Sequence, residues 1–138
     1  MQVKIKNEQL GQVINLLFDL SLKGKQSRQR SKFIKVLDER IKEVAEQEQE
    51  LLKEHCHLDD EGNPKIKNNG QEWDVKNVVA FRKDKIELLE EEIVLDGGDN
   101  EDMLKTVKTV LFDCEKEFSG QDAQVYDYLC DQFEESDE

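Results

Sequence analysis

The chain has 138 residues and a formal net charge of -13, from 33 acidic and 20 basic side chains. This length leaves room for one domain, and we predict a single α+β domain over residues 1–135, followed by a frayed acidic tail at 136–138. No apolar run approaches the roughly 18 residues of a membrane span, and residues 1–6 lack the hydrophobic region of a signal peptide, so a cytoplasmic protein without membrane contact is expected.

The first predicted elements are a short strand and a helix. Apolar and charged residues alternate in the opening QVKIKN, which is typical of a half-buried strand. Asn7 can cap a helix that stops at Gly24. The inner face of this helix has apolar residues at three-and-four spacing: Leu10, Val13, Ile14, Leu17, Phe18 and Leu20.

A long second helix follows, with Ser27 as its predicted cap. Its apolar seam has a heptad spacing that is interrupted by Glu48 and His55, which favours an antiparallel helical hairpin over a free coiled coil. The seam residues are Phe33, Leu37, Ile41, Val44, Leu51 and Leu58. The segment DDEGNP at 59–64 ends the helix, because Gly62 and Pro64 interrupt helical structure.

A small antiparallel sheet is predicted next. Asn69-Gly70 suits the type I′ turn of a hairpin between residues 65–67 and 72–76. An isolated two-stranded ribbon is marginally stable, so we expect this hairpin to pair with the N-terminal strand and to cover helix one with Trp73 or Val75.

Three further helices complete the predicted fold. Asn77 can cap a helix to about Glu92, whose apolar stripe is Val78, Val79, Ile86, Leu89 and Ile93. The run Ile93-Val94-Leu95 fits either an extension of this helix or a short strand. A fourth helix is predicted from Asn100, with apolar residues at Met103, Val107, Val110, Leu111, Cys114 and Phe118. Ser119 and Asp122 form a capping box for a fifth helix, whose inner face is Ala123, Tyr126, Leu129, Cys130 and Phe133. The fold class is therefore α+β and predominantly helical.

The charge is distributed unevenly along the chain. Residues 1–45 carry a net charge of +5 and residues 46–138 a net charge of -18. The candidate partner-binding residues are the six cations of the basic segment 23–35: Lys23, Lys25, Arg28, Arg30, Lys32 and Lys35. They could dock a phosphate or an acidic partner, or they could offset the acidic half of the same fold or of a homo-oligomer. Nucleic acid is the less favoured partner, because no aromatic residues are interleaved and the whole-protein field repels polyanions.

The acidic half also has two interpretations. Its carboxylates could imitate a phosphate backbone and occupy a nucleic-acid groove of a host protein, or they could be the solvated faces of amphipathic helices, which is the favoured interpretation. The carboxylates in question are Glu87, Glu90, Glu91, Asp113, Glu117, Asp127, Asp131 and Glu134.

No catalytic, cofactor or metal site is predicted. The group His55-Cys56-His57 has poor ligand spacing on a helix, although His55 and Asp59 could converge if a third ligand came from elsewhere. The run DGGDNED at 96–102 lacks the order of an EF-hand loop. The cysteines Cys56, Cys114 and Cys130 are odd in number and contain no CxxC, so we expect reduced packing thiols.

Three stretches of the sequence resemble a known family. They are VKIKNEQLGQVINLLFDLSLKGKQSRQRSKF (3–33), LDDEGNPKI (58–66) and DAQVYDYLCDQFEE (122–135). They are similar to an uncharacterised family of small acidic proteins encoded by phages and prophages of Gram-positive bacteria. The resemblance implies a virus-encoded accessory protein that works in the cytoplasm of an infected bacterium, and it carries no catalytic residues.

Together these features predict a non-enzymatic protein that binds a host or phage protein through its surface, such as an inhibitor of a bacterial defence factor. The alternatives are a structural or assembly accessory of the virion, for instance in the tail module, and a small nucleic-acid binder that uses the basic segment 23–35. A homo-oligomer is compatible with each of them.

Overall fold

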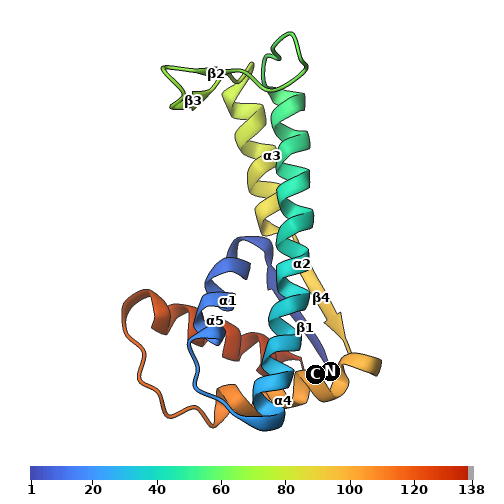
Figure 1. Cartoon of the computed structure of the whole chain (residues 1–138), viewed down its shortest axis with the longest axis vertical. Helices are drawn as coiled ribbons and strands as arrows, with labels where there is room; N and C mark the ends of the chain where they lie inside the picture. The colour runs from blue at the N-terminus through green and yellow to red at the C-terminus, as the bar shows by residue number, and fades with distance from the viewer. Residues whose placement is uncertain (137–138) are drawn as a thin grey trace. The chain divides into compact units, whose positions relative to one another are not determined.

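The computed structural model describes residues 1–136, and its backbone contacts divide into two compact units. We call Met1–Ile41 together with Glu92–Glu138 the core unit, and Lys42–Glu91 the hairpin unit. Residues 137 and 138 of the predicted acidic tail lie outside the description. The described elements are β1 (Gln2–Lys6), η1 (Asn7–Gln9), α1 (Leu10–Phe18), α2 (Gly24–His55), β2 (Ile66–Lys67), β3 (Glu72–Trp73), α3 (Val78–Glu90), β4 (Glu92–Asp96), η2 (Gly98–Asn100), α4 (Glu101–Phe112) and α5 (Gly120–Glu135) (Figure 1).

The predominantly helical α+β class is confirmed, but the predicted strand pairing is wrong. β1 pairs antiparallel with β4, with Val3 opposite Leu95 and Ile5 opposite Ile93. The ambiguous run 93–95 is therefore a strand. β4 has five residues, as β1 does, and Val3 and Ile5 of β1 are fully buried in this pair. β2 and β3 have only two residues each, and these are exposed. Burial of a matched apolar face decides the pairing.

The first helix is shorter than predicted. Asn7 lies in the 3-10 turn η1 and not at the position before α1, and its side chain accepts a hydrogen bond from Arg40 Nε at 3.0 Å. α1 ends at Phe18, whose side chain is 73% exposed, so Phe18 does not belong to the inner face. Leu20, beyond the helix end, is buried.

α2 begins at Gly24, three residues before the predicted Ser27 cap, and ends at His55. The chain starts this helix directly from the left-handed conformation of Gly24, at φ +60°. The seam residues Phe33 and Leu37 are buried in the core unit and Val44 in the hairpin unit. Leu58 lies beyond the helix and is half exposed.

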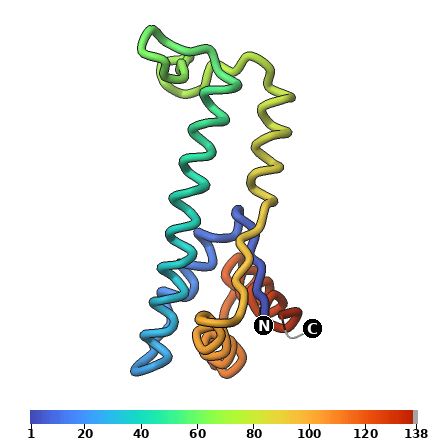
Figure 2. The backbone as a smooth tube through the Cα atoms, turned by 90° about the vertical axis from the view of Figure 1, so that its right-hand side faces the viewer, coloured from blue at the N-terminus to red at the C-terminus, as the bar shows by residue number. Residues whose placement is uncertain are grey.

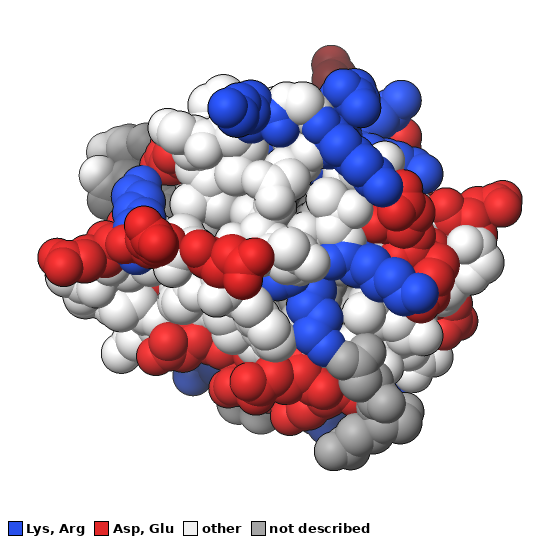
Figure 3. Space-filling model, turned by 90° about the horizontal axis from the view of Figure 1, so that it is seen from below, with Lys and Arg blue, Asp and Glu red and all other residues white. Residues whose placement is uncertain are grey.

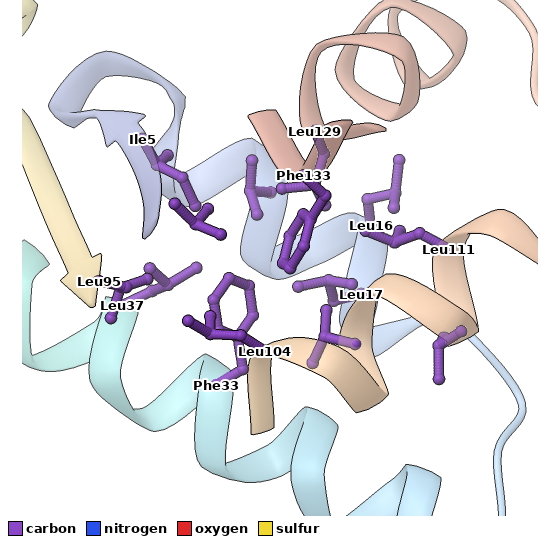
Figure 4. Close-up of a cluster of buried hydrophobic side chains, with 14 of the residues drawn as sticks. Ile5, Leu16, Leu17, Phe33, Leu37, Leu95, Leu104, Leu111, Leu129 and Phe133 are labelled. Carbon is purple, nitrogen blue, oxygen red and sulfur yellow. The ribbon is translucent and has the colours of Figure 1, made fainter. Parts of the chain in front are cut away.

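The core unit encloses one apolar cluster to which β1, α1, α2, β4, α4 and α5 all contribute (Figure 4). Phe33 of α2 meets Phe133 of α5 edge to face, with ring centroids 5.9 Å apart. This geometry is favoured between aromatic rings. Ser136, placed in the frayed tail by the sequence, is buried, and its hydroxyl donates to the Phe133 carbonyl at 2.6 Å.

The C-terminal helices also differ from the prediction in detail. α4 ends at Phe112, so Cys114 and Phe118 lie in the segment before α5. Phe118 stacks on Tyr126 with centroids 4.8 Å apart. Ser119 precedes α5 but makes no side-chain capping bond, so the predicted capping box is not formed.

In the hairpin unit, α3 and the second half of α2 form the predicted antiparallel helical hairpin (Figure 2). The Asn77 side chain accepts a hydrogen bond from Ala80 N at 3.1 Å, which confirms the predicted cap. The predicted stripe of α3 is largely on the outside, because Val78, Val79 and Ile86 are exposed while Leu88 is buried.

Residues 56–77 close the end of this helical hairpin. β2 and β3 form the predicted antiparallel ribbon, but its turn is wider than a two-residue turn, with Asn68, Asn69 and Gly70 all at positive φ. Trp73 does not cover α1. It lines a small hollow of about 70 Å³ with Phe81 of α3 and Leu52 of α2.

Candidate functional site

Two cations of the basic segment 23–35, Arg30 and Lys25, contact other parts of the core unit. Arg30 Nη1 donates to the carbonyls of Leu17 and Leu20, at the C-terminal end of α1, and the distance to Leu17 O is 3.1 Å. Lys25 Nζ lies 2.9 Å from Asp102 Oδ1 of α4. Arg30 therefore supports the core unit, whereas the Lys25–Asp102 ion pair is exposed to solvent and contributes little to stability.

The remaining cations of the segment are Lys23, Arg28, Lys32 and Lys35, and all four are exposed. Within residues 1–136 none of them lies within 4.0 Å of a carboxylate. Figure 3 shows Lys and Arg interspersed with Asp and Glu and with uncharged surface on one face of the molecule. Such mixing weakens the attraction of a polyanion and suits a contact with a partner protein of mixed charge.

A second candidate surface consists of exposed apolar side chains in the hairpin unit. Six of the nine large apolar residues that are exposed in the described chain belong to this unit: Leu58, Ile66, Trp73, Val78, Val79 and Ile86. The first five, between residues 58 and 79, are here called the apolar end. Ile66 and Trp73 are direct cross-strand partners, so their side chains lie together on one face of the ribbon.

Backbone hydrogen bonds hold the apolar end in place. Asp74 N donates to Lys65 O at 2.9 Å, and His57 N donates to Asp74 O at 2.9 Å. Isolated antiparallel β-bridges also pair Cys56 with Val75 and Leu58 with Pro64. The apolar side chains are thus presented by a fixed backbone, which lowers the entropy lost when a partner binds.

The three side chains of the His55-Cys56-His57 group lie in different environments and do not converge on one site. His55 Nε2 lies 2.6 Å from Asp84 Oδ2 of α3, and the ring packs edge-on against Phe81. Cys56 is fully buried and His57 is exposed. Asp59, the partner that sequence spacing suggested for His55, instead accepts hydrogen bonds from the amides of its own turn.

Sequence reasoning missed Asp84. α2 ends at His55, so the i,i+4 relation to Asp59 no longer holds, and the carboxylate comes from α3, 29 residues later. The sequence favoured a helical hairpin but did not indicate which helix pairs with α2, and this choice is what brings Asp84 to His55.

The cysteines are free thiols, as expected. Burial raises the pKa of the Cys56 and Cys130 thiols, and neighbouring carboxylates raise it further. Raised thiol pKa values keep both groups neutral and weakly nucleophilic at neutral pH. These two thiols therefore suit packing.

Among the described residues no helix is both long enough and apolar enough to cross a membrane. No curated protein and no solved structure matches the chain. The profile of one family, described as "Protein of unknown function (DUF1617)", matches residues 1–138. The prediction of an uncharacterised family is confirmed, and the chain belongs to the DUF1617 family.

Proposed function

We propose that this protein is a phage-encoded, non-enzymatic binding protein that inhibits a bacterial host protein, such as a defence factor, through surface contacts. The observation that carries the proposal is the apolar end of the hairpin unit. Val79 is 78% exposed, Val78 55% and Ile66 54%, although burial of such side chains is normally favourable.

The composition of the apolar end supports a protein partner. Trp73 is 41% exposed, and tryptophan is among the residues that contribute most to binding energy at protein interfaces. Lys67 and Glu72 form the next cross-strand pair, on the opposite face of the ribbon from Ile66 and Trp73, and their charged groups lie 4.0 Å apart. The ribbon therefore has one apolar face and one charged face. The exposed cations of the basic segment offer a second, electrostatic contribution to the rate of association.

Purification of the tagged full chain from the bacterial host, followed by reconstitution with the purified partner, tests this function. We expect Trp73→Ala combined with Val79→Ser to weaken partner binding at least 10-fold, because both remove apolar contact area. Phe18→Ser is the control, since Phe18 is an exposed apolar residue in the core unit, with an exposed fraction of 73%.

The proposal requires that the captured host protein loses activity when the wild-type chain binds. A partner that binds the double variant as tightly as the Phe18→Ser control would contradict the role of the apolar end. Recovery of virion or tail proteins in place of a host protein would favour a structural accessory. Nucleic-acid binding that an Arg28, Lys32 and Lys35 triple alanine variant abolishes would favour the basic segment as a nucleic-acid site.

A further inference from the structure

The strongest feature outside the proposed interface is a group of three ligand-type side chains in the hairpin unit. Glu54 and His55 come from the end of α2 and Asp84 from α3. Each of the three residues offers one potential ligand atom, and these atoms all lie within 4.8 Å of one another. One imidazole nitrogen and two carboxylate oxygens are ligands that Zn²⁺ accepts.

His55 is held in place by its surroundings. Its carbonyl accepts a hydrogen bond from Lys76 N at 2.8 Å, so the backbone is fixed where the helix ends. Its side chain is only 13% exposed, and its ring packs edge-on against Phe81 at 5.7 Å. A histidine with a fixed ring loses little rotamer entropy on binding a metal ion, which is a property of a preformed ligand.

The charge around the group favours a cation. A groove of about 290 Å³ runs along the same face of α2 and α3, and Glu54 and Asp84 belong to its lining. Its other charged lining residues are Glu50, Glu87 and Glu91. The lining contains five carboxylates and no Lys or Arg, so a divalent cation would relieve their mutual repulsion.

The distances are compatible with a metal ion after small movements. Two ligand atoms that share a tetrahedral Zn²⁺ at about 2.1 Å each lie about 3.4 Å apart. The His55 Nε2 to Asp84 Oδ2 distance of 2.6 Å would lengthen by less than about 1 Å to admit the metal ion. Glu54 is exposed and can adjust its rotamer to close the third side.

We propose that Glu54, His55 and Asp84 form a binding site for a divalent transition-metal ion, with Zn²⁺ as the fitting member of this class. The ion joins α2 to α3 in the hairpin unit, and its remaining coordination position is open to water or to a partner's side chain. This site is independent of the proposed inhibition, because its ligands are separate from the apolar end.

The test is a titration of the chelator-treated full chain with ZnCl₂, followed by calorimetry and by the thermal unfolding midpoint. We expect one ion per chain and a midpoint that rises by about 5 °C or more at 100-fold excess over the dissociation constant. Asp84→Asn and His55→Gln should each weaken the affinity at least 10-fold. His57→Gln is the matched control, since His57 is an exposed histidine two residues away, and it should bind as the wild type does.

Two further measurements keep the proposal testable if a His55 variant does not fold. Glu54→Gln replaces an exposed side chain and should weaken binding without changing the unfolding midpoint of the metal-free chain. The side-chain nitrogen signals of His55 should shift on addition of Zn²⁺ while those of His57 stay in place. Absence of binding to the wild type, unchanged binding by Glu54→Gln and Asp84→Asn, or loss of binding in His57→Gln would each overturn the proposal.

Discussion

The core unit and the hairpin unit bury very different amounts of apolar surface. Eighteen buried apolar side chains form a single cluster in the core unit. In the hairpin unit the buried apolar residues are Val44, Leu52, Cys56 and Leu88, while six large apolar side chains are exposed. The core unit therefore supplies most of the stability of the chain, and we expect the hairpin unit, with its few buried apolar side chains, to have the lower local stability.

Substitution in the core cluster is expected to give the largest effect. Phe133→Ala removes a fully buried ring that packs on Phe33, and it should lower the free energy of unfolding by about 3–5 kcal/mol. Urea unfolding followed by circular dichroism measures this change. The control Phe18→Ala, at an exposed site, should stay within about 0.5 kcal/mol of the wild type. Similar losses for both variants would contradict the division between buried and exposed rings.

The next largest effect is expected for Arg30, which differs from the exposed Arg28 of the same basic segment. Arg30→Ala leaves the Leu17 and Leu20 carbonyls without their charged donor, and we expect a loss of about 1.5–3 kcal/mol in the free energy of unfolding. Arg28→Ala removes an exposed charge and should change it by less than about 0.5 kcal/mol. Equal stability of the two variants would show that Arg30 does not support α1.

Tyr126 provides a pH-dependent test of the core unit. Its hydroxyl donates a hydrogen bond to the Leu111 carbonyl. The pKa of Tyr126 is raised to about 12, mainly by burial and to a smaller extent by a hydrogen bond with Cys130. The neutral phenol therefore stabilises the fold fully below the ordinary value near 10, and this stabilisation is lost as the pH rises towards 12. Tyr126→Phe should cost about 1 kcal/mol at pH 8 and should flatten the loss of stability between pH 10 and 12. Parallel wild-type and variant curves in alkaline urea titrations would rule this role out.

The smallest expected effect on global stability concerns the hairpin unit. Asn77→Ala removes the cap of α3, worth about 1 kcal/mol of helix stability. Because this unit buries few apolar side chains, we expect the loss to be local. Amide hydrogen exchange should accelerate in α3 while β1, β4 and α5 keep their protection. Acceleration in both units to the same degree would mean that they unfold together.

Much of the fold could be predicted from local sequence signals. The alternation of QVKIK indicated β1, the Asn77 cap was correctly placed, and the heptad seam indicated a helix that pairs with another helix. The strand pairing could not be predicted, because the run 93–95 satisfies helical and extended periodicity equally and only a matched partner surface selects one of them.

The candidate sites show the same limit. The sequence located the basic segment and the His55 group, but it treated all six cations as one group, either docking an acidic partner or offsetting the acidic half of the chain. Arg30 differs from Arg28 only because the carbonyl groups at the end of α1 lie within reach of its guanidinium group. Likewise, the exposure of Val78 and Val79 depends on which face of α3 meets α2, a choice that an apolar stripe alone does not fix.

The sequence by itself determined the helical α+β class, the acidic charge and its unequal distribution, because these depend on composition and on short-range periodicity. Only the tertiary structure decided that β4 completes the sheet, that Arg30 supports α1, and that Asp84 meets His55. Each of these contacts joins residues distant in the chain, and their selection depends on competition for buried surface and for unsatisfied polar groups.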